Sequence, residues 1–332
     1  MKVSVLGSGS FGTAIANVLG DKGYNVFLYA TRKELVDPIN EIHENVEYLK
    51  GFKLSENIFG TTDLEYSLKD TALIVLAIPT QQLSKFVRDH LNLFPDNVPI
   101  VCVAKGIEEN TLRLVSEILE EELPGRYHKN LCYLSGPSFA KEIVQRFPTL
   151  VSIASRNEEV AKKVQNYFYT SYFRTYWHDD VIGVEIGGAL KNVIAIACGV
   201  SDGLNLGHNT RAALITRGLV EIQRLGVKKG ANPITFLGLT GLGDLVLTCT
   251  GELSRNRTVG YQLGQGKVLS DIIKDLHQVA EGVYTAKSAF ELSKKFQIEM
   301  PITESVYKML YENIPPKEIV KYLMQRELKK EF

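Results

Sequence analysis

The sequence has few cysteines and no excess of charge of one sign. Its 332 residues include 38 Lys and Arg against 38 Asp and Glu, a formal net charge of zero. No large basic surface for nucleic acid or an anionic membrane is therefore expected. The four cysteines are far apart and form no Cys-x-x-Cys pair: Cys102, Cys132, Cys198 and Cys249. This spacing favours free, packed thiols over disulfides or a zinc site.

Long hydrophobic runs and metal-ligand spacings are also missing. No apolar run approaches the roughly 18 residues of a membrane span. The sequence opens directly into an apolar strand over Lys2–Leu6, which leaves no room for a signal peptide. The histidines have no ligand spacing with Cys or carboxylates: His43, His90, His128, His178, His208 and His277. We expect a soluble, cytoplasmic protein with no metal site, no nucleic-acid partner and no membrane insertion.

Short β-branched runs alternate with helical patterns in the first half. The strands predicted there are Val3–Leu6, Asn25–Tyr29, Ala72–Ile78, Ile100–Ala104, Leu131–Leu134 and Leu150–Ala154. Such apolar strands between helices favour a parallel sheet covered on both faces, the doubly wound Rossmann-like arrangement of an α/β protein. After Tyr172–Tyr176 the strand signals stop, and the later apolar spacing is helical. We predict a sheet domain over residues 1–180 and an all-helical domain over residues 181–332.

The first predicted strand runs into Gly7, Gly9 and Gly12, which have GxGxxG spacing and are followed by a helical pattern. The first glycine allows a tight turn, the second lets a pyrophosphate approach the backbone, and the third lets the helix lie close to the sheet. Free amides at the helix start would face the phosphates, and Ser10 and Phe11 fall at the tip of the turn. The sequence predicts a dinucleotide-binding domain, and the alternative is a purely structural glycine turn.

The second predicted strand is followed by Thr31 and Arg32, where an NAD-specific domain usually has Asp or Glu for the ribose hydroxyls. That acid is missing. A guanidinium at this position can instead bind the 2′-phosphate of NADPH. We predict that NADPH is accepted and can be the preferred cofactor, with a merely solvated Arg32 as the alternative.

Polar residues follow two further predicted strands. Lys105 comes directly after Ile100–Ala104, and strand carboxyl ends carry the ligands in such sheets, so it is a candidate for an anionic or carbonyl group. Its alternative is a surface lysine. After Leu131–Leu134, Gly136 shapes a turn and Ser138 either caps a helix or binds a phosphate or carbonyl oxygen at the helix start.

A lone Lys191 lies beside Asn192 in the otherwise apolar helical run VEIGGALKNVIAIA. Burying an ammonium costs free energy unless it is partnered, so such a lysine indicates chemistry more than packing. The alternative is a lysine that extends from the edge of a core helix to solvent. We expect this helix to meet the sheet at the carboxyl ends of the strands, where the active site of an α/β protein lies.

Several segments, in order, resemble the bacterial NAD(P)-dependent sn-glycerol-3-phosphate dehydrogenases over nearly the whole length. They are GSGSFGTA from Gly7, VAKGIE from Val103, SGPSFAKE from Ser135, GGALKN from Gly187, GLTGLGDL from Gly238, SRNR from Ser254 and VAEGVYTAK from Val279. The resemblance implies reversible reduction of dihydroxyacetone phosphate with NAD(P)H, in support of glycerophospholipid synthesis.

The resemblance also implies roles for individual residues. Lys191 would be the general acid and base. The implied substrate contacts are Lys105, Gly136, Ser138, Lys191, Asp244, Ser254, Arg255 and Asn256. The implied cofactor contacts are Gly7, Gly9, Ser10, Phe11, Gly12, Arg32, Lys105, Ala140, Arg255, Val279 and Glu281.

The chemistry of these residues suits a phosphorylated ketone. Asp244 is expected to hold Lys191 or a substrate hydroxyl, or else to cap a helix. The SRNR segment offers a hydroxyl, an amide and two guanidiniums for a phosphate, because Arg gives forked, charge-assisted donors. Glu281 is either a helix cap or a polar cofactor contact. Phe11 stands where the family commonly has Trp, and His208 is expected to be an exposed loop residue.

Two alternatives remain open at this point. One is another two-domain Rossmann dehydrogenase that uses the same lysine chemistry on a β-hydroxy acid or ketopantoate. The other is a redox sensor that binds NADPH without turnover. A homodimer is the expected oligomer on base rates alone.

Overall fold

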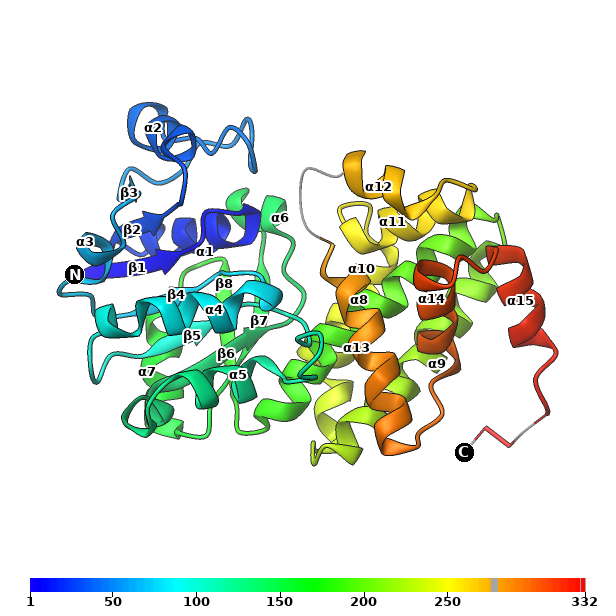
Figure 1. Cartoon of the computed structure of the whole chain (residues 1–332). Helices are drawn as coiled ribbons and strands as arrows, with labels where there is room; N and C mark the ends of the chain where they lie inside the picture. Colours follow the sequence, from blue (N-terminus) through cyan, green and yellow to red (C-terminus); the bar gives the residue numbers. More distant parts are fainter. Residues whose placement is uncertain (276–279, 329, 332) are drawn as a thin grey trace.

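The structure is a computed structural model that describes residues 1–275, 280–328 and 330–331. A sheet with helices packed on it forms the amino-terminal half, and helices form the other half, beside it (Figure 1). The strands are β1 (Lys2–Leu6), β2 (Asn25–Tyr29), β3 (Ile58–Thr61), β4 (Ile74–Leu76), β5 (Ile100–Cys102), β6 (Leu131–Ser135), β7 (Thr149–Ala154) and β8 (Phe173–His178). Their order in the eight-stranded sheet is β3-β2-β1-β4-β5-β6-β7-β8.

Helices connect the strands and then form the second half. In the sheet half they are α1 (Ser10–Asp21), α2 (Lys33–Ile42), α3 (Leu64–Leu68), α4 (Thr80–His90), α5 (Val115–Glu122), α6 (Ala140–Val144) and α7 (Glu158–Phe168), with short 3₁₀ turns η1 (Leu91–Leu93) and η2 (Gly125–Asn130). The helical half contains α8 (Val181–Gly203), α9 (Gly207–Lys228), η3 (Pro233–Leu237), the π-helical turn η4 (Leu239–Gly243), α10 (Asp244–Thr250), α11 (Arg255–Gly264), α12 (Leu269–Asp275), α13 (Glu281–Phe296), α14 (Pro301–Tyr311) and α15 (Pro316–Met324).

Both faces of the sheet are covered, as the apolar strands predict. Successive side chains of a strand point to opposite faces. Val5 of β1 accordingly packs in one apolar cluster and its neighbour Leu6 in another. In β4, Val75 joins the first cluster and Leu76 the second. The predicted doubly wound architecture is therefore confirmed.

Two details of the sheet differ from the sequence prediction. The strand β3 was not predicted; its four residues IFGT pair in parallel with β2 at the edge of the sheet. The strand β7 runs antiparallel to β6, whereas a parallel sheet was expected, and β8 is again parallel to β7. Strand direction depends on the connection between strands, which apolar periodicity does not report.

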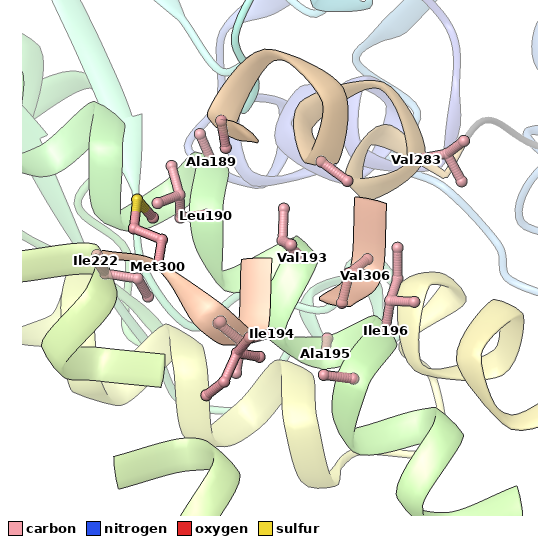
Figure 2. Packing of buried hydrophobic residues seen from close by; sticks show 14 of the residues in the cluster. Ala189, Leu190, Val193, Ile194, Ala195, Ile196, Ile222, Val283, Met300 and Val306 are labelled. Atoms are coloured by element: carbon pink, nitrogen blue, oxygen red, sulfur yellow. The ribbon is translucent and has the colours of Figure 1, made fainter. Parts of the chain in front are cut away.

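Helix α8 is the centre of the helical half. Ile194 of α8 packs in one apolar cluster with Ile222 of α9 and Val306 of α14 (Figure 2). Helix α11 also packs on α8. A Cβ added at Gly260 of α11 would lie 2.0 Å from the carbonyl oxygen of Ile196, so only glycine permits this close crossing. The crossing brings the start of α11 toward the middle of α8.

The apolar character of α8 follows from its burial. By length and composition this 23-residue helix could cross a membrane, so the expectation that no apolar run approaches that length is wrong. Yet 94% of its most apolar window is buried inside the protein, as in the core helix of a helical domain. The four cysteines are free and buried, which confirms their predicted role in packing.

Candidate active site

A cavity of about 1180 Å³ extends from the glycine turn after β1 to the middle of α8. Its walls come from the carboxyl ends of strands β1, β2, β4 and β5, from α4 and from the start of α11. The predicted site residues that line it are Gly7, Gly9, Ser10, Phe11, Gly12, Arg32, Lys105, Ser138, Ala140, Lys191, Ser254, Arg255, Asn256 and Glu281. Residues far apart in the sequence thus share one cavity. It lies at the carboxyl ends of the strands where the strand order reverses between β1 and β4, the place where such sheets bind ligands.

The glycine turn has the geometry that the motif predicts. Gly7 has φ +115°, and a Cβ there would lie 2.5 Å from the carbonyl oxygen of Ala77. A Cβ at Gly12 would lie 2.0 Å from the carbonyl oxygen of Gly7. At Gly9, by contrast, an added Cβ meets no atom within 4 Å, and this residue precedes α1 without a side-chain cap. Open space above uncapped helix amides fits a pyrophosphate.

Asp244 joins two lysines at the other end of the cavity. The side chain of Asp244 is fully buried. One of its carboxylate oxygens accepts a hydrogen bond from Lys191 Nζ, and the other accepts one from Lys105 Nζ at 2.8 Å. Lys191 also donates to Thr248 Oγ1 at 3.0 Å, and Lys105 to the carbonyl oxygen of Gly136 at 3.1 Å. Asp244 is the first residue of α10, yet its side chain holds both lysines instead of capping that helix.

The surroundings of Lys191 favour loss of its proton near neutral pH. Burial lowers the pKa of Lys191 to about 8, the charge of Asp244 opposes this shift, and the charge of Lys105 adds to it. Only 7% of the Lys191 surface is exposed, so the ammonium does not extend to solvent. A lysine that titrates near pH 8 can both donate and accept a proton under physiological conditions.

The start of α11 forms a polar wall beside Lys191. Ser254 accepts a hydrogen bond from the Arg257 amide and so caps the helix. Asn256 donates to Asn192 of α8 at 2.9 Å and is held in place by it. Arg255 lies in the cavity wall with its side chain exposed. The second guanidinium of the SRNR segment is not part of this wall, because Arg257 is ion-paired with Asp202 at 2.7 Å.

Glu281 is a cavity residue and does not cap its own helix. It is the first residue of α13, and its Oε1 accepts a hydrogen bond from the Thr80 amide at 3.3 Å. Burial raises the pKa of Glu281 to about 7, although the Thr80 hydrogen bond opposes the shift. Within the described residues, Oε2 of Glu281 and Oγ1 of Thr80 have no hydrogen-bond partner. Of these two residues, Glu281 lines the cavity, and its unpartnered carboxylate oxygen fits a ligand that carries an amide.

Other predicted residues have more specific neighbours than the sequence indicates. Lys105 Nζ lies 5.8 Å from the centre of the Phe11 ring, a cation–π contact. Ser10 Oγ donates to the carbonyl oxygen of Tyr48. Ser138 Oγ donates to the carbonyl oxygen of Gly136 at 2.8 Å. Of the two alternatives for Ser138, the helix cap is therefore wrong: Phe139 precedes α6, and no side chain caps that helix.

Several expectations fall outside the cavity. Gly136 and Asp244 are not among its lining residues; both lie behind the lysines, which they fix by hydrogen bonds. Val279 lies outside the described residues. His208 is exposed as expected, but it belongs to the first turn of α9 and not to a loop, and it is not a lining residue.

The sequence analysis missed three contributors to the site. Thr248, which contacts Lys191, lies four residues after Asp244, a spacing that puts both on one helix face and could have revealed it. Tyr48 lines the cavity next to Arg32, and Asn45 donates hydrogen bonds to Ser8 and Thr13 beside the glycine turn. No motif marks this segment, because its position depends on tertiary contacts.

Comparison with known proteins agrees with this geometry. Residues 2–161 match the family model of the NAD-dependent glycerol-3-phosphate dehydrogenase N-terminus, and residues 180–321 match that of the C-terminus. A glycerol-3-phosphate dehydrogenase [NAD(P)+] of Leptospira biflexa is 56% identical over 331 residues, which cover 100% of this chain and 99% of that protein. A crystal structure of glycerol-3-phosphate dehydrogenase from Coxiella burnetii superposes with a TM-score of 0.92 at 38% identity, covering 98% of this chain and 99% of the other.

A more distant similarity bears on the alternative dehydrogenase. A ketopantoate reductase from Ralstonia eutropha superposes with a TM-score of 0.61 at 11% identity, covering 96% of this chain and 100% of the other. At this identity only the fold is shared, so the ketopantoate alternative is not favoured. The chain belongs to the NAD-dependent glycerol-3-phosphate dehydrogenase family.

Proposed function

We propose that the protein catalyses the reversible NAD(P)H-dependent reduction of dihydroxyacetone phosphate to sn-glycerol 3-phosphate. One observation carries this proposal: Lys191 is buried at the cavity wall, with Asp244 between it and Lys105. The chain also matches glycerol-3-phosphate dehydrogenases over its full length. Family and site therefore support the same reaction.

The residues around the glycine turn fit a dinucleotide. The open space at Gly9 and the uncapped start of α1 suit the pyrophosphate, and Ser10 and Phe11 follow directly. Glu281 and Arg255 would contact the nicotinamide end, with Ala140 in the adjoining wall. When bound, the reduced cofactor supplies a hydride. Val279 remains a predicted contact from the resemblance alone.

Lys191 would supply the proton that ketone reduction needs. As an ammonium it donates to the carbonyl oxygen and stabilises the charge that develops there; as a neutral amine it removes the hydroxyl proton in the reverse direction. Asp244 would be a positioning residue, because it holds the Nζ atoms of both Lys191 and Lys105. Lys105 keeps a second positive charge beside the same carboxylate and would contact the substrate.

The start of α11 would bind the substrate phosphate. Arg255 offers a forked cationic donor. Asn256 and the backbone amides at the start of α11, just after the Ser254 cap, add neutral donors. Ser138, which also lines the cavity, would contact the substrate as well. Binding the phosphate away from the carbonyl orients the reacting carbon, so these contacts serve turnover as well as affinity.

Arg32 would bind the 2′-phosphate of NADPH, which makes NADPH an accepted cofactor. Its guanidinium lines the cavity just after β2, at the position where NAD-specific domains have an acid. In this proposal NADPH is accepted beside NADH and can be the preferred cofactor.

The setting of the reaction is proposed on broader grounds. Four buried free thiols suit a reducing cytoplasm, where the product would feed glycerophospholipid synthesis.

We take residues 1–180 as the dinucleotide-binding domain and 181–332 as the substrate-binding domain, since β8 ends at His178 and α8 begins at Val181. A homodimer is proposed on base rates alone, and light scattering would then give twice the chain mass.

A substrate panel tests the proposed reaction. Oxidation of NADH and of NADPH is followed at the nicotinamide absorbance with dihydroxyacetone phosphate and, separately, with ketopantoate. Consumption only with dihydroxyacetone phosphate supports the proposal, whereas turnover of ketopantoate would replace it. Tight cofactor binding without turnover of either compound would support the redox-sensor alternative instead.

A further inference from the structure

The guanidinium that is the candidate for the 2′-phosphate already has a carboxylate partner. Arg32 Nη2 lies 2.6 Å from Glu47 Oε1 and 3.3 Å from the hydroxyl of Tyr48. Both side chains of the ion pair are accessible to solvent, with 49% of Arg32 and 37% of Glu47 exposed. A ligand can therefore reach this pair. It meets a guanidinium whose positive charge is already balanced by the Glu47 carboxylate.

The segment that carries Glu47 is fixed to the cofactor turn. Asn45 is buried and donates hydrogen bonds at 2.8 Å to the Ser8 carbonyl oxygen and to Thr13 Oγ1. The Asn45 side chain also accepts from the Tyr48 amide, and Ser10 Oγ donates to the Tyr48 carbonyl oxygen. Asn45 before Glu47 and Tyr48 after it are thus tied to the glycine turn and the start of α1. The carboxylate is held beside Arg32 by the fold and not only by its own ion pair.

Tyr48 continues the same wall. Tyr48 and Arg32 both line the cavity, and the residue after Tyr48, Leu49, is buried. The residues after β2 supply the arginine, and the separate segment 45–49 supplies the acid that the β2 end itself lacks. The charge at this end of the cavity is therefore decided by two elements together.

We propose that Glu47 is a specificity-determining residue that weakens binding of a 2′-phosphorylated cofactor by competing for Arg32. The inference rests on the proposed binding of the 2′-phosphate by Arg32. A phosphate that binds Arg32 must displace the Glu47 carboxylate from the guanidinium or share the guanidinium with it. If they share it, the negative charge of the phosphate is repelled by the carboxylate a few ångströms away. NADH has neutral hydroxyls at this position, so Glu47 discriminates between the two cofactors without touching the reacting atoms.

The test compares Glu47→Gln with the wild-type protein in binding titrations that do not depend on turnover. Dissociation constants are measured for NADPH and NADH from the change in nicotinamide fluorescence, and for adenosine 2′-monophosphate by calorimetry. We expect NADPH and adenosine 2′-monophosphate to bind about 3- to 10-fold more tightly to the variant, with NADH unchanged within twofold. Because the effect is electrostatic between exposed groups, raising the salt concentration to about 0.5 M should remove most of it.

Two further variants separate the inference from the function on which it rests. Glu56→Gln is the matched control, because it also removes one carboxylate, but Glu56 is paired with Lys53 and not with Arg32. It should leave all three dissociation constants unchanged. Arg32→Ala should weaken NADPH and adenosine 2′-monophosphate and make Glu47→Gln ineffective in the double variant. If Arg32→Ala has no effect, the 2′-phosphate assignment itself is wrong. If Arg32→Ala weakens NADPH but Glu47→Gln changes nothing, or weakens NADH, the role of Glu47 is overturned.

Discussion

Asp244 and Lys191 form an ion pair that is buried where α8 crosses α10. The second oxygen of the same carboxylate binds Lys105, so one negative charge is shared by two ammonium groups. Burial and the nearby Lys105 lower the pKa of Lys191, while Asp244 limits the shift. The acidity of the proposed catalytic lysine is thus set by the balance of three groups from three separate elements.

Removing the charge of Asp244 should impair proton donation. In Asp244→Asn the opposing effect of the carboxylate is lost, so the pKa of Lys191 falls further and less ammonium is present at neutral pH. We expect kcat for reduction at pH 7.5 to fall at least about tenfold, with the alkaline limb of the pH profile moved to lower pH. The pH profile of kcat measures this shift.

Thr248→Val is the matched control for Asp244→Asn. It removes a neutral hydrogen bond to Lys191 and leaves the ion pair. A pH profile that moves as far in Thr248→Val as in Asp244→Asn would contradict the electrostatic account.

The two directions of the reaction should respond oppositely to pH. Reduction needs Lys191 protonated, so its rate should fall as the pH rises through about 8, the pKa to which burial lowers this group. Oxidation of glycerol 3-phosphate needs the neutral amine and should rise over the same range before it levels off. Initial rates in both directions between pH 6 and pH 10 measure this, and parallel profiles would argue against Lys191 as the shared acid and base.

Loss of the Arg255 guanidinium should affect the phosphorylated substrate more than an unphosphorylated one. A hydrogen bond to a charged group contributes about 1.5–3 kcal/mol, so Arg255→Ala should lower kcat/KM for dihydroxyacetone phosphate by roughly 10- to 100-fold. The rate with dihydroxyacetone, which has no phosphate, should fall less, because only the proposed cofactor contact of Arg255 is then lost. The control is Arg257→Gln, which breaks the ion pair with Asp202 and should not alter the ratio between the two substrates. Equal losses of kcat/KM for both substrates in Arg255→Ala would contradict the proposal that Arg255 binds the substrate phosphate.

Two glycines of the turn should respond differently to alanine. A Cβ at Gly12 lies 2.0 Å from the Gly7 carbonyl oxygen, so Gly12→Ala should lower the Tm as well as cofactor affinity. A Cβ at Gly9 meets open space, so Gly9→Ala should keep the Tm and weaken only the cofactor, by obstructing the approach of the pyrophosphate. Thermal unfolding and cofactor titration separate the two effects, and a lowered Tm in Gly9→Ala would contradict this interpretation.

The sequence predicts features that depend on local pattern, and it fails where distant segments meet. Residue spacing and type are enough to predict the glycine turn, the apolar strands and a lone lysine in an apolar helix. The strand β3 is too short for its periodicity to be recognised, and the antiparallel direction of β7 depends on the connection from β6.

Side-chain partners are the least predictable part of the site. Asp244 and Lys105 are 139 residues apart, and only the docking of the helical half on the sheet makes them neighbours. The same holds for Arg32 and Glu47, which belong to different segments. A helix cap was one of two alternatives for Ser138. Its hydroxyl instead donates to the Gly136 carbonyl oxygen, because a hydroxyl after a turn has several acceptors within reach.

The proton-donating role of Lys191 is tested most directly by single-turnover reduction of dihydroxyacetone phosphate by Lys191→Ala and by the wild-type protein, with cofactor affinity measured in parallel. We predict that the variant binds the cofactor normally and loses about 10²- to 10⁴-fold in the rate of the chemical step, the range expected for a general acid. A variant that binds the cofactor and reduces the substrate at the wild-type rate would contradict the account.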